Sequence, residues 1–264
     1  MSEQNAVVIV SGGAAVSPFT TPTEACRSGL AAGNTDTALR EALLGAGHQV
    51  FTSPARVGEG QVSEDTGWGG FSDGPAPLPA EMTVNCVGDI DLAGANLLNF
   101  WLYLQETFGI ETLDIVGHSM GGLFSRSAIR QAREQDSSLI IRSLTTVGTP
   151  WTGAFSADYA RGTIPLADCN GDPVCEASMT KFAEAVAQAS QGAGEEVTDA
   201  YLGGVRGWNA RQGDALAGIP VVLLGGDYFS QSGADDVWPN DGLVALKSAL
   251  AREVSNEVLP SKVT

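Results

Sequence analysis

The sequence is organised around residues 113–122, which read LDIVGHSMGG. Residues 113–116 are mostly apolar and strand-like, and they lead directly into the pattern Gly-x-Ser-x-Gly. Residues 123–130 follow with helical spacing. A serine on a sharp turn between a strand and a helix is strained so that its hydroxyl stands above the sheet, and the two glycines leave room where strand and helix cross. The stretch therefore predicts a nucleophile elbow with Ser119 as the nucleophile.

This arrangement resembles the α/β-hydrolases, and the letters GHSMGG are most similar to their lipase and esterase branch. The resemblance implies a mostly parallel sheet with helices on both faces, and hydrolysis of a carboxylic ester through an acyl-Ser119 intermediate. The N–H of Met120 would then be one donor of an oxyanion hole. In that branch the histidine before the nucleophile, here His118, is a neighbour of the serine and not the catalytic base.

A second donor is expected in the loop after the first strand. Residues 6–10 form a β-branched run without polar alternation, which is typical of a strand buried on both faces. In the lipases that the chain resembles, this strand ends in His-Gly, followed by a residue whose N–H helps to form the oxyanion hole. Here Ser11 stands at the histidine position and Gly13 at the donor position. A glycine-rich turn without that role is the alternative.

The order of the other elements favours an α/β fold independently of the resemblance, because continuous apolar strands alternate with amphipathic helices. We expect helices at 37–44 and 89–108 and strands at 49–53, 139–147 and 219–226. Residues 55–80 lack periodicity and predict a long loop. Between 155 and 218 the strand signal disappears and helical segments take its place, at about 178–190 and 195–202. We interpret 1–264 as one domain in which 155–218 is a helical cap over the site.

Two further stretches resemble parts of a lipase site. Residues 148–153, GTPWTG, resemble the turn that borders the acyl pocket, so Trp151 and Phe155 are expected to line that pocket. Residues 240–244, NDGLV, match the acid-bearing loop of bacterial triacylglycerol lipases. The match implies that Asp241 is the triad acid, although Asp-Gly is also an ordinary turn dipeptide.

The predicted triad lacks a base. The chain has two histidines; His118 belongs to the elbow, and His48 opens a strand at the edge opposite it. In the family the base follows the acid by one helix and a loop, and residues 258–264 read as the entry into a final strand. We therefore expect the sequence to be cut short before its histidine, and the chain as given to be nearly inactive. A non-catalytic lipid-binding pseudo-hydrolase, a thioesterase, an amidase and an acyltransferase remain alternatives.

The composition narrows the range of partners. The chain has 14 lysines and arginines against 31 aspartates and glutamates, a net charge of −17. Phosphate backbones and anionic lipid surfaces would repel it, so we expect a neutral acyl-ester or lipid substrate and no nucleic acid. No apolar run approaches the ~18 residues of a membrane span, so no stable membrane anchor is expected. We also expect no metal site and no cofactor, because histidines are few and the calcium-like residues 168–179 lack the turn glycine and the closing glutamate.

Four cysteines permit three pairings. Proximity favours Cys169–Cys175, which leaves Cys26–Cys86; four buried thiols are the alternative. Two disulfides would place the protein in a secreted or extracytoplasmic setting. The first residues, MSEQN, show no positively charged signal-peptide region.

Overall fold

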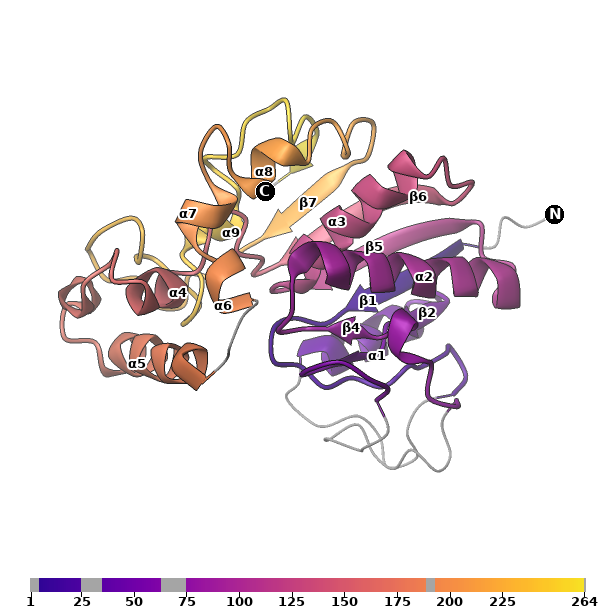
Figure 1. Cartoon of the computed structure of the whole chain (residues 1–264), viewed down its shortest axis with the longest axis horizontal. Coiled ribbons are helices and arrows are strands. Elements are labelled where there is room, and N and C mark those ends of the chain that lie inside the picture. Colours follow the sequence, from indigo (N-terminus) through magenta and orange to yellow (C-terminus); the bar gives the residue numbers. More distant parts are fainter. Residues whose placement is uncertain (1–4, 25–34, 63–74, 189–192, 264) are drawn as a thin grey trace. The chain divides into compact units, whose positions relative to one another are not determined.

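The computed structural model describes residues 5–24, 35–62, 75–188 and 193–263. It divides into two compact units, Met1–Thr145 and Thr146–Thr264, which we describe separately as unit 1 and unit 2. Figure 1 shows the helices and strands of each.

A parallel sheet forms the centre of unit 1. Strand β1 (Asn5–Val10) lies between β2 (Val50–Thr52) and β5 (Thr112–His118), and it pairs in parallel with both. The sheet continues from β5 to β6 (Ile140–Val147), which runs from unit 1 into unit 2. Val10 is in register with Gly117, so the loops that follow β1 and β5 leave the same edge of the sheet. This edge is where ligands bind in parallel α/β sheets.

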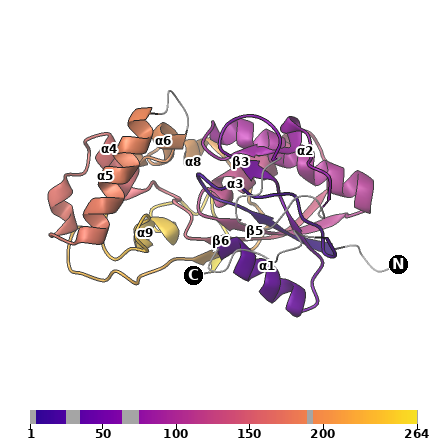
Figure 2. The ribbon, with the colours of Figure 1, turned by 90° about the horizontal axis from the view of Figure 1, so that it is seen from below.

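Helices cover both faces of this sheet, as the sequence predicts. Figure 2 shows α1 (Thr35–Gly45) on one face, with α2 (Ile90–Phe108) and α3 (Gly121–Glu134) on the other. Asp89 directly precedes α2, and its side chain accepts hydrogen bonds from backbone N–H groups of the first turn. Gly109, with φ +66°, directly follows the last residue of the helix. These are the N-cap and the left-handed C-terminal glycine that stop a helix at both ends.

The apolar stripe of α2 packs into the core of unit 1. Ile90, Leu97, Trp101 and Leu104 recur at helical spacing, and all four are fully buried. Burial of each such side chain contributes roughly 1.5–3 kcal/mol. This face of α2 is therefore part of the core of unit 1.

In the described part of unit 1, one stretch differs from the secondary structure that the sequence predicts. Within 55–80, expected as a loop, β3 (Ala55–Arg56) pairs in parallel with β4 (Val84–Asn85). Two-residue strands are too short to show the alternation that identifies a strand in a sequence. Residues 63–74 of this predicted loop, which include Trp68 and Phe71, lie outside the described residues.

Unit 2 is helical between 155 and 218, where no described residue lies in a strand. Helix α5 (Pro173–Gln188) extends the predicted helix at its start. The predicted helix at 195–202 is instead two short ones, α6 (Ala193–Glu196) and α7 (Asp199–Leu202), because the Thr198 hydroxyl caps α7 and interrupts the run. The remaining helices here are α4 (Phe155–Ala160), η3 (Leu166–Cys169) and α8 (Trp208–Arg211).

A small core joins these helices. Phe155 of α4 packs with Met179 of α5, with Trp238, and with the disulfide Cys169–Cys175. This disulfide is the one that the sequence predicts. It lies within residues 168–179, the stretch that resembles a calcium loop but lacks its turn glycine and closing glutamate.

The second expected disulfide is not formed. Cys86 is a buried free thiol, and Cys26 lies outside the described residues.

Two parallel strands complete unit 2. Strand β7 (Val221–Leu224) pairs with β8 (Lys262–Val263), which confirms a strand at the end of the described chain. The Gly148 N–H, directly after β6, donates to the Leu224 carbonyl. Between β7 and β8 lie a loop and α9 (Leu246–Ala249). Across the described residues, we found no helix with the length and apolar character that crossing a bilayer requires.

Candidate active site

Ser119 lies on the turn between β5 and α3, at the sheet edge that β1 and β5 share. Its φ is +52°, a left-handed conformation that is uncommon for a residue with a side chain. The turn is closed by a hydrogen bond from the Gly122 N–H to the Ser119 carbonyl, 3.1 Å long. Helix α3 begins two residues after the serine, so the positive end of its dipole lies next to it.

Glycines make this tight crossing possible. A Cβ on Gly121 would lie 2.8 Å from the carbonyl oxygen of Ser11 and closer still to that of Val10. A Cβ on Gly117 would lie 2.6 Å from the backbone of Gly122. These neighbours are backbone atoms of the sheet and helix, which cannot move aside. The two glycines of the sequence pattern therefore occupy the positions where strand, turn and helix touch.

The glycine loop after β1 adjoins the serine. A Cβ on Gly12 would lie 2.5 Å from the Cβ of Ser119 and 3.1 Å from its Oγ. A Cβ on Gly13 would lie 3.0 Å from Sδ of Met120. Unit 1 thus brings together the residues that the sequence assigned to the nucleophile and to the oxyanion hole. Their catalytic roles remain predictions.

His118 has a partner that the sequence did not suggest. Its Nδ1 lies 3.1 Å from Oδ1 of Asp36, in the first turn of α1; the exposed fractions of the two side chains are 34% and 4%. From the sequence alone, an aspartate in the first turn of a helix is expected to interact with the helix dipole. Nothing in the spacing links residue 36 to residue 118.

His48 lies far from the serine. Its side chain is exposed, and its backbone N–H donates to the Leu43 carbonyl at the end of α1. Val50, two residues later, is in register with Val7, which is in register with Asp114. Ser119 therefore lies about seven residues further along the strands than His48, or roughly 20 Å at the usual rise per strand residue. This agrees with the expected place at the opposite edge of the sheet.

In unit 2, Asp241 lies on the loop that follows β7. Its Oδ1 accepts hydrogen bonds from the N–H groups of Leu243 (3.0 Å) and Val244 (2.8 Å), which fixes the carboxylate on a tight turn. Its Oδ2 would lie 3.0 Å from a Cβ on Gly148, and its own Cβ 2.9 Å from one on Gly226. Gly148 directly follows β6, and Gly226 is the second residue after β7, so the carboxylate stands at the carboxyl ends of these two strands.

The two residues expected in an acyl pocket are buried. The indole N–H of Trp151 donates to the Thr146 hydroxyl (3.1 Å), and its carbonyl accepts from Asn209 of α8. Phe155 begins α4 and belongs to the core around the disulfide. Both side chains contribute to the packing of unit 2, and their role in binding an acyl chain stays a prediction.

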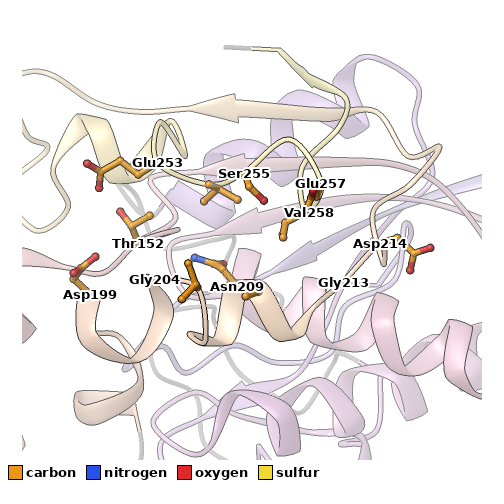
Figure 3. Close-up of a pocket in the computed structure, with 14 residues that line it drawn as sticks. Thr152, Asp199, Gly204, Asn209, Gly213, Asp214, Glu253, Ser255, Glu257 and Val258 are labelled. Carbon is orange, nitrogen blue, oxygen red and sulfur yellow. The ribbon is translucent and has the colours of Figure 1, made fainter.

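Unit 2 also contains a cavity of about 630 Å³, shown in Figure 3. Thr152 of the GTPWTG turn lines it, and so do four carboxylates: Asp199, Asp214, Glu253 and Glu257. Burial raises the pKa of the Asp199 carboxyl, and the nearby Glu253 raises it further. The negative lining disfavours an anionic ligand. No cluster of three metal-ligating side chains occurs in the part of the chain that the structure describes.

Comparison with solved structures identifies the class of fold to which the protein belongs. The mature form of the Bacillus licheniformis lipase BlEst2 matches with a TM-score of 0.56 and 16% identity, over 94% of this chain and 80% of that one. Its propeptide form matches with a TM-score of 0.55 and 14% identity, over 94% of this chain and 44% of that one. The protein has the α/β-hydrolase fold.

A narrower match comes from the sequence. Residues 80–161 match the family described as "Putative serine esterase (DUF676)". This stretch runs from the segment before α2, through β5, Ser119 and α3, to the residue after α4. No curated protein matches the chain.

Proposed function

We propose that the protein is a carboxylic ester hydrolase of the lipase and esterase type, acting through an acyl-serine intermediate on Ser119. The observation that carries this proposal is the strained turn of Ser119 between β5 and α3, with the Gly12–Gly13 loop against its side chain. A serine presented in this way is the nucleophile of α/β-hydrolases. The family match over residues 80–161 and the fold of the lipase from B. licheniformis support the same class.

The mechanism assigns one task to each group. Ser119 Oγ attacks the carbonyl carbon of the ester while an imidazole takes its proton, and the N–H groups of Met120 and Gly13 stabilise the oxyanion. The imidazolium returns the proton to the departing alcohol. Water then attacks the acyl-enzyme by the same route and releases the acid. Asp241 orients the imidazole and stabilises its charged form.

In this proposal neither histidine of residues 1–264 is the base. His48 lies roughly 20 Å from Ser119 along the strands. His118 directly precedes the nucleophile, and in the lipases that the chain resembles this histidine is a neighbour of the serine and not the base. Residues 1–264 would then provide nucleophile, acid and oxyanion hole, and they should be nearly inert on esters when expressed alone.

The substrate class follows from charge and apolar surface. A net charge of −17 repels anionic substrates, which favours a neutral acyl ester or lipid. Trp151, Phe155 and the helical segment 155–218 would supply the acyl pocket and its cap. The disulfide Cys169–Cys175 supports an extracytoplasmic location, because such bonds persist outside a reducing cytosol.

The proposal is tested by kinetics on the full-length natural protein with p-nitrophenyl esters of increasing acyl length. Ser119→Ala should lower kcat by about 10⁴-fold or more, and Asp241→Asn by about 10²–10⁴-fold. Ser138→Ala, at an exposed serine after α3, is the control and should leave kcat unchanged. Turnover that survives Ser119→Ala contradicts the proposal. Ester binding without turnover, unaffected by Ser119→Ala, would instead identify a non-catalytic binding domain.

A further inference from the structure

The loop that carries Gly13 depends on contacts from outside the loop. Within it, the Ala15 N–H lies 3.4 Å from the Gly12 carbonyl oxygen, a long hydrogen bond. Ala14, between them, has φ +56°, which is costly for a residue with a side chain. A loop with these features needs an external anchor if the Gly13 N–H is to stay in one place.

Cys86 provides such an anchor. It follows β4 directly and is fully buried. Its Sγ lies 3.0 Å from the Ala15 carbonyl oxygen and 3.1 Å from that of Arg56, and its backbone N–H donates to the same Arg56 oxygen at 2.9 Å. The thiol carries one proton, which it donates to one of these two carbonyls at a time. The side chain thereby links the loop after β1 to the β3–β4 pair.

The same cysteine also borders Gly13. A Cβ on Gly13 would lie 3.8 Å from the Cys86 carbonyl oxygen and 3.0 Å from Sδ of Met120. The segment that carries the second oxyanion donor is therefore near both the first turn of α3 and the end of β4. A shift of Cys86 would act on Gly13 as well as on Ala15.

We propose that Cys86 is a positioning residue for the oxyanion hole, in which its buried thiol holds the Ala15 carbonyl and so fixes the Gly13 N–H toward the reacting carbonyl of the ester. The proposal rests on the function proposed above. Cys86 touches no substrate; it acts through the loop.

The protonation state of the thiol suits this role. Burial raises the pKa of Cys86 to about 11. At neutral pH the group is therefore a neutral thiol, which can donate a hydrogen bond, whereas a thiolate could only accept one. The same burial explains why we assign no nucleophilic role to this cysteine.

The test compares Cys86→Ala with Cys86→Ser in the full-length protein, with rates normalised to titrated active sites. Loss of one oxyanion donor costs roughly 10²–10³ in kcat, so a displaced donor should cost about 10-fold or more. We expect Cys86→Ala to lower kcat by that amount with KM nearly unchanged. Serine keeps a donor and should stay within about threefold of the natural enzyme. A trifluoromethyl ketone, whose serine adduct carries an oxyanion, should bind Cys86→Ala about tenfold more weakly.

Val84→Ala is the matched control, because Val84 is a fully buried residue of β4, the short strand that Cys86 directly follows. It should lower the unfolding midpoint without changing kcat per active site or the affinity for the ketone. Equal losses in Val84→Ala and Cys86→Ala would reduce Cys86 to a structural role and overturn the inference. Ser119-dependent turnover that Cys86→Ala leaves intact overturns this inference alone, whereas absence of Ser119-dependent turnover overturns the proposed function as well.

Discussion

At the scale of single residues, Gly121 makes the turn at Ser119 possible. A methyl group there would meet backbone atoms of Val10 and Ser11 at the end of β1. We expect Gly121→Ala to lower the free energy of unfolding by about 3 kcal/mol or more, since such overpacking cannot be relieved by moving a side chain. Denaturant unfolding measures this.

Gly45 is the control for that change. It ends α1, and a Cβ there would meet nothing within 4 Å. Gly45→Ala should be neutral or stabilise by up to about 1 kcal/mol. If the two alanine variants prove equally stable, the close crossing at Ser119 is wrong.

Asp158 gives a prediction about pH. Burial, and to a smaller extent the carboxylates of Asp199 and Asp236, raise the pKa of Asp158 to about 6, from 3.8. The folded state therefore binds the proton more tightly than the unfolded state, and ionisation of this group opposes folding. Its contribution is most unfavourable above pH 6, and stability is gained as pH falls from 7 toward 4.

Asp158→Asn should remove that gain. The asparagine still offers an oxygen to the Asp199 N–H, which Asp158 accepts at 3.0 Å. The quantity to compare is the free energy of unfolding of the variant minus that of the natural protein. Allowing for solvent screening, this difference should be about 1–2 kcal/mol larger at pH 7 than at pH 4. Urea unfolding at both pH values provides the comparison. Parallel pH profiles for the two proteins would contradict the assignment.

At the scale of elements, the start of α2 depends on one side chain. Asp89 Oδ1 accepts hydrogen bonds from the N–H groups of Asp91 and Leu92, both at 2.9 Å. Asp89→Ala should cost about 1 kcal/mol, and Asp89→Asn less, because asparagine is also a good N-cap. Glu106→Ala, at an exposed position late in the helix, should stay within about 0.5 kcal/mol. Equal losses at 89 and 106, measured by thermal unfolding, would argue against the cap.

The lengths of the helices and strands explain which of them the sequence could predict and which it could not. Strand β1 and helix α2 are long enough for their apolar patterns to identify them. Strands β3 and β4 have two residues each, and their pairing depends on neighbours almost thirty positions away. The break between α6 and α7 depends on the Thr198 cap, which the helical period of the apolar residues does not show.

The candidate site shows the same division. The local pattern around Ser119 predicted its turn, and the resemblance to the lipases implied that Gly13 would lie near it. The contact between His118 and Asp36, and that between Cys86 and Ala15, join residues about 70 to 80 positions apart. No spacing rule relates residues so distant, because only the completed fold brings them together.

At the scale of the whole molecule, an α/β-hydrolase fold is retained at 16% identity to the lipase from B. licheniformis. Such a fold hosts many functions, so the proposed activity depends on the site and not on the fold. In unit 1, Ser119 and the Gly12–Gly13 loop follow the carboxyl ends of β5 and β1; in unit 2, Asp241 stands at those of β6 and β7. The central claim is that Ser119 is the nucleophile.

The most direct test is covalent labelling of the full-length protein with a p-nitrophenyl alkylphosphonate, followed by peptide mass spectrometry. Only an activated serine displaces the nitrophenolate, so the phosphonyl group marks the nucleophile itself. We expect one label per molecule, on the peptide that contains Ser119, and none in Ser119→Ala. Label on any other residue of the natural protein, or its persistence in Ser119→Ala, would contradict the account.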